Sequence, residues 1–321
     1  MDWLSRLLDM MPVSGRLDIR CFYGAPWRVA YERAKAGEIP YHIVLGGSAI
    51  IEDPTGGPPQ HLGVGDIVLL PHGSEHVLHD GSGAAPAPAQ NRSTLNVTIS
   101  ENAGAGERLD MLCGHFVLAP PHDRLMRTYL PARLVVRARQ EAAAQAPPSV
   151  AQVAGLVALM RTESGAEGLG GHAMLNALSA ALFALAMRLA SEAEHAPTGL
   201  LALAGHPRLA PALTAMFHEP ARPWTLPALA RLCNMSRATM ARHFQERVGR
   251  SASELLTDIR MTLAANELKK PALSTEAVAE VAGYQSVAAF KRAFKQRIGM
   301  TPAEWRRAAQ RNTSASAGFS P

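Results

Sequence analysis

Cysteine is scarce in this sequence, with three among 321 residues. Three cysteines cannot build a disulfide scaffold, and they suit a reducing compartment, where a disulfide is transient and redox-sensing rather than structural. Aromatic residues make up 5% and charged residues 18%, whereas hydrophobic residues reach 47%. That balance excludes a disordered or collagen-like chain. The length allows two domains, each with a core of its own.

Long uncharged apolar runs are also lacking. The most apolar stretch, Ala173–Ala190, contains an asparagine, a serine and an arginine, so we interpret it as a buried helix rather than a membrane span. Charged residues interrupt the apolar N-terminal stretch, unlike the pattern of a signal peptide. The sequence therefore predicts a cytoplasmic protein without a membrane partner.

Charge is unevenly distributed along the chain. Residues 206–311 contain 17 Lys and Arg against 8 Asp and Glu, a balance of +9, and the remainder has 15 against 19, a balance of −4. A basic segment on a mildly acidic body suggests a polyanionic partner for that segment. A solvated basic face is the alternative, but arginines within helical patterns favour nucleic acid.

The first 130 residues are expected to form an all-β barrel or sandwich. Short apolar runs such as Tyr41–Leu45, Ala49–Ile51 and Ile67–Leu70 alternate with Gly- and Pro-rich turns, as in barrels and sandwiches. Gly81–Asn91 is expected to be a low-complexity loop.

The rest of the chain is expected to be helical. Residues 131–204 form a connector, and a possible dimerisation region, with helices over Ser149–Thr162 and His172–Glu194, followed by a linker at His195–Gly199. Residues 205–311 form an all-α domain, and residues 312–321 a disordered tail.

An internal repeat marks the helical domain. Leu229–Cys233 recurs 49 residues later as Val278–Ala282, and the pattern Met-x3-Phe-x4-Gly at 240–249 recurs 50 residues later as Phe-x3-Phe-x4-Gly. Each unit consists of a helix, a turn, a Ser N-cap (Ser236 or Ser286), a second helix and a Gly stop. Two such pairs in a basic segment indicate two helix-turn-helix units.

The second helix of each unit is expected to enter a major groove. Arg242 and Arg292 occupy equivalent positions, where an arginine can bind guanine O6 and N7 with two hydrogen bonds. A helical bundle with solvated arginines is the alternative. The residues expected to face DNA, with the two caps, are Ser236, Arg237, Ala238, Ala241, Arg242 and Gln245, then Ser286, Val287, Ala288, Ala289, Lys291, Arg292 and Lys295.

These motifs resemble the AraC/XylS type of DNA-binding domain, over Trp224–Arg307 and including Gly283-Tyr284-Gln285-Ser286 and Gly299-Met300-Thr301-Pro302. The resemblance implies two helix-turn-helix subdomains joined by a long helix, about Ala252–Leu268, with base-reading residues in the two second helices. It also implies a sequence-specific regulator, with promoter DNA and RNA polymerase as partners. Several base-reading positions are alanine here, so DNA shape is expected to contribute to specificity.

A second motif lies in the β-rich part. Gly65-x5-Pro71-x-Gly73-x2-His76 is similar to the second cupin motif. This similarity implies that residues 1–130 form an all-β, cupin-like barrel that acts as a sensor domain. The His-x-His pair of metal-binding cupins is broken after His42, and Glu52 remains. His42, His72 and His76 are weak metal candidates, so we expect neither metal nor cofactor.

Two cysteines, Cys21 and Cys113, lie near the two ends of the barrel sequence. With the opening residues and Leu112-Cys113-Gly114, they resemble AraC-family regulators with a cupin sensor, among them a type responsive to hypochlorous acid. That resemblance implies that the pair senses oxidant, with His115 available to lower the pKa of Cys113. Two small buried residues are the alternative, and Cys233 is interpreted as inert packing.

Two functions remain open from the sequence. The first is a non-enzymatic transcription regulator, an activator controlled by an oxidant or a small-molecule effector, with a second copy of the chain as a candidate partner in a homodimer. The second is a cupin metal-dependent enzyme or small-molecule binding protein. No nucleophile–base set and no phosphate-binding loop supports an enzyme.

Overall fold

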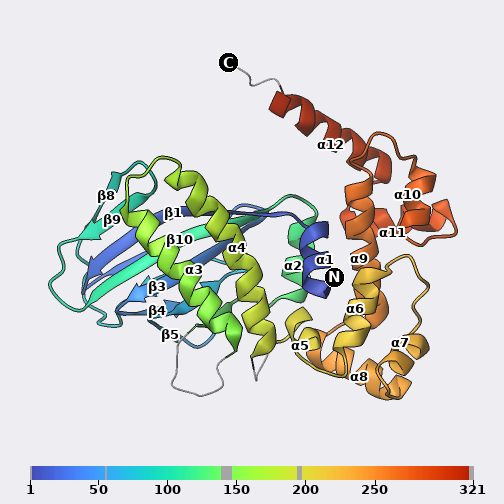
Figure 1. Ribbon diagram of the computed structural model, residues 1–321, viewed down its shortest axis with the longest axis horizontal. Coiled ribbons are helices and arrows are strands. Elements are labelled where there is room, and N and C mark those ends of the chain that lie inside the picture. The colour runs from blue at the N-terminus through green and yellow to red at the C-terminus, as the bar shows by residue number, and fades with distance from the viewer. Residues whose placement is uncertain (1, 55, 139–146, 194–196, 318–321) are drawn as a thin grey trace. The chain divides into compact units, whose positions relative to one another are not determined.

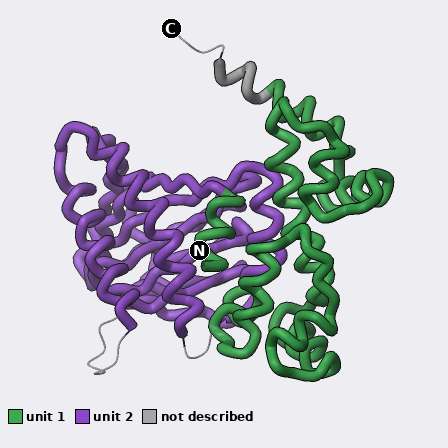
Figure 2. Tube along the Cα trace, turned by 45° about the vertical axis from the view of Figure 1, so that its right-hand side comes forward, with its two compact units in different colours: residues 1–11, 198–321 green, residues 12–197 purple. Residues whose placement is uncertain are grey.

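A computed structural model describes residues 2–54, 56–138, 147–193 and 197–317 (Figure 1). The chain forms two compact units: a β-rich unit, Pro12–Pro197, and a helical unit, Met1–Met11 with Thr198–Pro321 (Figure 2). This division differs from the expected one in two ways. The first eleven residues join the C-terminal helices, and most of the expected connector belongs to the β-rich unit because its helices pack on the sheet.

The β-rich unit contains two sheets. The larger has seven strands in the order β11-β6-β3-β10-β1-β9-β8, and the smaller has four in the order β2-β7-β4-β5. The strands are β1 (Val13–Gly24), β2 (Arg28–Tyr31), β3 (Glu38–Gly46), β4 (Ser48–Glu52), β5 (Gln60–Gly63), β6 (Asp66–Leu69), β7 (His76–His79), β8 (Ala89–Ser93), β9 (Thr98–Asn102), β10 (Arg108–Leu118) and β11 (Leu134–Arg137). The expected β-rich, cupin-like fold is confirmed.

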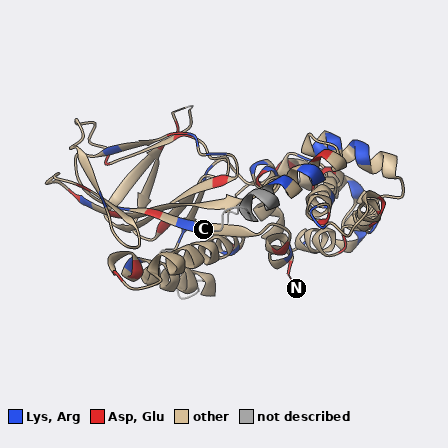
Figure 3. Ribbon diagram, turned by 90° about the horizontal axis from the view of Figure 1, so that it is seen from above, with Lys and Arg blue, Asp and Glu red and all other residues tan. Residues whose placement is uncertain are grey.

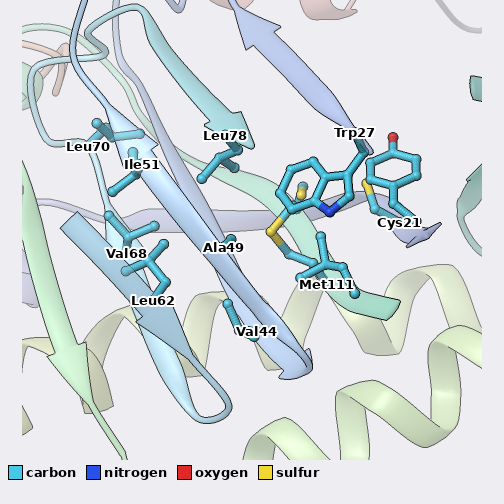
Figure 4. Close-up of a cluster of buried hydrophobic side chains, with 13 residues drawn as sticks. Cys21, Trp27, Val44, Ala49, Ile51, Leu62, Val68, Leu70, Leu78 and Met111 are labelled. Atoms are coloured by element: carbon cyan, nitrogen blue, oxygen red, sulfur yellow. The ribbon is translucent and has the colours of Figure 1, made fainter. Parts of the chain in front are cut away.

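A buried cluster lies between the two sheets (Figure 4). It combines side chains from both sheets, including Cys21 and Met111 from the larger sheet and Ile51 and Leu78 from the smaller one, with Trp27 beside Cys21. Successive strand residues point to opposite faces, so the apolar residues at alternate positions of β1 and β10 face this core. The cluster encloses both cysteines of the unit.

Helices cover the other face of the larger sheet. α4 (Gly171–Glu192) packs against β1, and α3 (Pro148–Gly165) packs against α4; α2 (His122–Tyr129) precedes β11. Gly15 permits this approach, because a Cβ there would lie 2.4 Å from the backbone nitrogen of Ala180. By length and composition, α4 is the one helix of the described segments that could span a membrane. Its packing on the sheet is that of a core helix, as expected from its polar residues.

The helical unit contains α1 and eight later helices within the described residues. They are α1 (Trp3–Met10), α5 (Leu200–Ala204), α6 (Ala210–His218), α7 (Leu226–Leu232), α8 (Arg237–Val248), α9 (Ala252–Glu267), α10 (Thr275–Val281), α11 (Val287–Ile298) and α12 (Pro302–Ala317). The pairs α7–α8 and α10–α11 each pack together, and α9 joins them. The indole nitrogen of Trp305 donates to the carbonyl oxygen of Ala265 at 2.9 Å, which fixes α12 to α9.

The N-terminal helix α1 packs on α6 and α9, about two hundred residues further along the chain. The rings of Trp3 and Phe217 lie 6.2 Å apart, and the Asn266 amide donates to the carbonyl oxygen of Met10. Leu4 and Leu7 are buried. Nothing in the local sequence pattern predicted this partnership.

Two sequence expectations fall at chain segments that the structure covers only in part. The tail was expected to be disordered over 312–321, but α12 extends to Ala317, and 318–321 lie outside the described residues. The linker expected at His195–Gly199 begins at 195–196, which also lie outside them. The loop expected over Gly81–Asn91 ends within strand β8.

Candidate nucleic-acid interface and buried cysteine pair

The two helix-turn-helix units have matching ends. The Ser236 hydroxyl accepts a hydrogen bond from the Thr239 amide at 3.1 Å, and the Ser286 hydroxyl accepts from the Ala289 amide at 3.4 Å. Gly249 ends α8 with φ +70°, and Gly299 ends α11 with φ +87°. A left-handed residue at this place suits glycine, so the predicted caps and stops are present.

Each second helix has one buried face. Met240 and Phe244 of α8 are buried, as are Phe290 and Phe294 of α11. The expected outward residues are exposed except Val287 and Ala289, which are half-buried. Val287 packs against the core of its subdomain, so its predicted outward position is wrong. The exposed set is Arg237, Ala238, Ala241, Arg242, Gln245, Ala288, Lys291, Arg292 and Lys295.

The two second helices differ in charge. Position by position, Ala241 and Gln245 of α8 correspond to Lys291 and Lys295 of α11. In addition, the Arg242 guanidinium lies 3.8 Å from a Glu246 carboxylate oxygen. Figure 3 shows Lys and Arg along the helices of the helical unit. The exposed surface of α11 is therefore more positive than that of α8.

Long helix α9 orients the two subdomains through polar contacts. Its Asp258 carboxylate lies 3.4 Å from the Arg297 guanidinium of α11. On the other side, Arg260 donates to the carbonyl oxygens of Pro220 and Arg222 at 2.6 and 2.9 Å, in the segment before α7. These contacts connect α9 to both helix-turn-helix units and so hold the two units in a fixed orientation.

Cys21 and Cys113 meet in the core of the β-rich unit. In the β1–β10 ladder Cys21 is opposite Met111 and Cys113 is opposite Ile19, so the two are diagonal neighbours on one face. Both are free thiols and are at most 3% exposed. Residues separated by 92 positions are thus in contact.

The two thiols have opposite electrostatic environments. A hydrogen bond from Cys113 lowers the pKa of Cys21, whereas burial raises the pKa of Cys113 well above its ordinary value. His115 does not contribute as expected, because its Nδ1 lies 2.6 Å from an Asp18 carboxylate oxygen. Of the two thiols, Cys21 is therefore the one that loses its proton more readily.

Tyr31 connects the cysteine pair to two histidines. Its hydroxyl lies 3.6 Å from the Cys113 sulfur. Its ring stacks on His76 with centroids 4.7 Å apart and lies 4.8 Å from His42. The short strand that carries it, Arg28–Tyr31, went unrecognised in the sequence, because four residues without apolar–polar alternation give no strand signal.

His42 and His76 are hydrogen-bonded to each other, with their Nε2 atoms 2.8 Å apart. His76 Nδ1 lies 3.0 Å from the Ser74 carbonyl oxygen and must donate to it, so His76 Nε2 is the acceptor. His42 therefore donates through Nε2, and its buried Nδ1 is left as an acceptor without a partner. Burial lowers the pKa of both rings, that of His42 well below its ordinary value.

The remaining candidate ligands are engaged elsewhere. His72 Nε2 bonds the Leu130 carbonyl oxygen at 3.0 Å, and Glu52 pairs with His79 at 3.2 Å. In the described part of the chain, no three His, Cys, Asp or Glu residues are placed to hold a metal ion. Two hydrogen-bonded imidazoles do not fit the three or four ligands of a cupin metal centre. The sequence grouping of His72 with His42 and His76 is wrong.

A buried ion pair lies behind the cysteines. Arg20 precedes Cys21 and points to the opposite face of β1, where its guanidinium binds both carboxylate oxygens of Asp110 at 2.9 and 3.0 Å. It also donates to the Arg161 carbonyl oxygen and the Ser164 hydroxyl of α3. Sequence reasoning missed this pair, although an arginine between apolar strand residues was a visible signal.

Comparison with known proteins agrees with these two features. Residues 2–192 match a family model described as Cupin, and residues 229–308 match one described as Helix-turn-helix domain. An activator from Escherichia coli K12 named RCS-specific HTH-type transcriptional activator RclR is 29% identical, over 95% of this chain and 97% of its own. HTH-type transcriptional regulator MtrA of Neisseria gonorrhoeae is 29% identical, over 96% and 98%.

An uncharacterised HTH-type transcriptional regulator of Haemophilus influenzae is also 29% identical, over 96% of this chain and 99% of its own. Among solved structures, a DNA-binding transcriptional dual regulator from Escherichia coli K-12 is 30% identical, covers 32% of this chain and 91% of its own, and has a TM-score of 0.30. ToxT from Vibrio cholerae O395 is 12% identical, covers 93% and 97%, and has a TM-score of 0.36.

A β-rich cupin unit joined to two helix-turn-helix units defines a regulator of the helix-turn-helix class with an attached cupin domain. The chain belongs to the cupin family over residues 2–192, and as a whole it is an AraC-type transcription regulator.

Proposed function

We propose that this chain is a cytoplasmic transcription activator without enzymatic activity, and that oxidation of Cys21 and Cys113 switches it on. The observation that carries the proposal is the placement of these two buried thiols as diagonal neighbours on adjacent core strands. The name of the RclR relative, an RCS-specific activator, supports both the activating sense and an oxidant of the hypochlorous acid class. RNA polymerase is the partner that an activator requires.

The chemical step begins at Cys21, whose pKa is lowered by Cys113. Its thiolate attacks the chlorine of hypochlorous acid, forming a sulfenyl chloride and releasing hydroxide. The Cys113 thiol then attacks the Cys21 sulfur, forming the disulfide and releasing chloride and a proton. In total the two thiols lose two electrons. One molecule of hypochlorous acid gains these electrons and is reduced to chloride.

The disulfide requires a change of backbone. Diagonal neighbours across an antiparallel pair lie about 7–8 Å apart, whereas a disulfide needs Cα atoms within about 7 Å. Paired strands already lie about 4.8 Å apart, so closing that difference requires β1 to shift along β10. The ladder already has a register irregularity between Leu17 and Ile19, where such a shift meets least resistance.

A covalent route for the signal runs through the N-terminus. β1 begins at Val13, two residues after α1 ends. α1 packs on α6 and on α9, the helix that joins the two helix-turn-helix units. Movement of β1 therefore pulls on a helix that belongs to the helical unit, and this supports β1 as the transmitting strand.

For DNA, we propose that α8 and α11 enter successive major-groove segments and read bases chiefly through Arg242 and Arg292. The supporting observation is their equivalent, exposed placement in the two units. A homodimer would present four such helices. The connector helices offer apolar surface for it, since Leu159 of α3 and Met174 of α4 are 59% and 47% exposed.

The test combines DNA selection with an oxidant titration. The purified full chain selects its sites from a random DNA library, and the selected site drives a reporter in cells exposed to hypochlorous acid. Wild type and Cys233→Ala should be induced alike, because Cys233 lies in the other unit. Cys21→Ala should lose induction but still bind the site. Wild-type induction in a folded, DNA-binding Cys21→Ala variant would overturn oxidant sensing by this pair.

A further inference from the structure

The β-rich unit has an apolar groove that the oxidant proposal does not use. Its volume is 410 Å³, within the range of about 300–1,000 Å³ for small-molecule sites. One wall consists of Val44 and Leu45 at the end of β3, with Val64 and Gly65 in the β5–β6 turn. Val64 is 54% exposed although it is apolar, which marks an uncovered rim.

The other wall is a second apolar face of α3. Ala154, Val157, Ala158 and Arg161 line it at positions i, i+3, i+4 and i+7, the spacing of one helix face. Other residues of α3, such as Val153 and Met160, are buried. Small alanines face the groove, so the helix leaves the space beside the strand unfilled.

The charge at one end of the groove is unbalanced. Asp110 is already bound through both oxygens by Arg20. Arg161 is the second arginine beside this carboxylate, but its nitrogen stays 3.6 Å away and its side chain is 56% exposed. Two guanidinium groups thus share one carboxylate, and Arg161 has hydrogen-bonding capacity left for an anion.

We propose that this groove binds a small amphipathic anion, with the apolar body against Val44, Val157 and Ala158 and a carboxylate on Arg161. The Arg161 backbone carbonyl holds Arg20, the neighbour of Cys21. A ligand bound at Arg161 therefore acts on the strand that carries Cys21. The β-rich unit then responds to a second signal that involves no oxidation. The binding itself needs no thiol.

Octanoate and 1-octanol are the probes, because they share an alkyl chain and differ in the charged head. Titration calorimetry of the purified full chain should give saturable octanoate binding at one site per chain. Arg161→Gln should weaken octanoate binding about ten-fold, as expected for losing a hydrogen bond to a charged group. The same variant should leave the weaker binding of octanol unchanged.

Ala158→Phe fills the groove and should abolish the binding of both probes. Ala151→Phe is the matched control, because it places the same ring on the same helix at an exposed position outside the groove lining. Absence of saturable octanoate binding, or wild-type binding by Ala158→Phe, would overturn the proposal. Cys21→Ala should bind octanoate normally, so failure of this site and failure of oxidant sensing are separate results.

Discussion

Cys21 on β1 and Cys113 on β10 are diagonal neighbours inside the core between the two sheets, and Cys113 lowers the pKa of Cys21 while burial raises the pKa of Cys113. The pair is therefore asymmetric before any oxidant arrives. One thiol is the nucleophile, and its partner is the group that resolves the first oxidation product.

This asymmetry predicts an order of reaction. In Cys113→Ser, whose hydroxyl can still donate to Cys21, the sulfenyl chloride should hydrolyse to a trappable sulfenic acid on Cys21, detected by mass spectrometry after dimedone labelling. In Cys21→Ala, Cys113 should remain largely unlabelled, because it loses its partner and stays buried. Cys233→Ala should form the intramolecular disulfide as wild type does. Preferential labelling of Cys113 would show that the assigned nucleophile is wrong.

Arg242 and Arg292 should contribute to base discrimination. Replacing either by alanine should cost about 1–3 kcal/mol of binding to the selected site and relax the preference at one or two base positions. Binding to the selected and to random sequences is measured by fluorescence anisotropy. Arg188→Ala, in the β-rich unit, is the control and should bind as wild type. Equal losses on both DNAs would mean that the two arginines contact only phosphate.

The basic helical unit should make binding steeply dependent on salt. Lys295→Gln should weaken binding to all sequences alike and reduce the slope of log Kobs against log salt by about 1, the value for one phosphate contact. Titrations at several salt concentrations give the slope. A salt-independent affinity in wild type would contradict the electrostatic argument from the +9 balance of residues 206–311.

The buried histidine pair should make stability depend on pH. Burial lowers the pKa of His42 and His76 in the folded chain, whereas an unfolded histidine has a pKa of about 6.5. Below that pH the unfolded chain binds more protons than the folded chain, so the free energy of unfolding falls as pH falls. The full contribution is present above about pH 7.

Urea unfolding between pH 7.5 and 5.5 measures this slope, which is at most about 1.4 kcal/mol per pH unit for each histidine. Replacing both His42 and His76 by glutamine should flatten it. His61→Gln, at an exposed position of β5, should not. An unchanged slope in the double variant would assign the pH dependence to other groups.

The N-terminal helix should couple oxidation to DNA binding. Trp3→Ala removes the contact with Phe217 and should reduce the oxidant response of the reporter about five-fold or more, the scale of a typical coupling free energy. Asp9→Ala is the control, because Asp9 is exposed on the same helix. If Trp3→Ala keeps its site affinity and the full oxidant response, β1 does not transmit the signal through α1.

The sequence by itself determined what depends on neighbouring residues. Serine caps, glycine stops and apolar spacing act within one or two turns of helix, so Ser236, Gly249 and their counterparts Ser286 and Gly299 could be placed in both units. The buried Phe244 and Phe294 follow from the same periodicity. Local chemistry was sufficient because the same caps and stops occur in both units of the repeat.

Tertiary structure decided the contacts between distant segments. The resemblance implied Cys21 and Cys113 as a pair, but only the β1–β10 register made them diagonal neighbours and gave them opposite pKa directions. Three sequence expectations failed for the same reason: His115 binds Asp18, His72 binds the Leu130 carbonyl, and Val287 joins a core. Each partner comes from packing between segments, which no local pattern encodes.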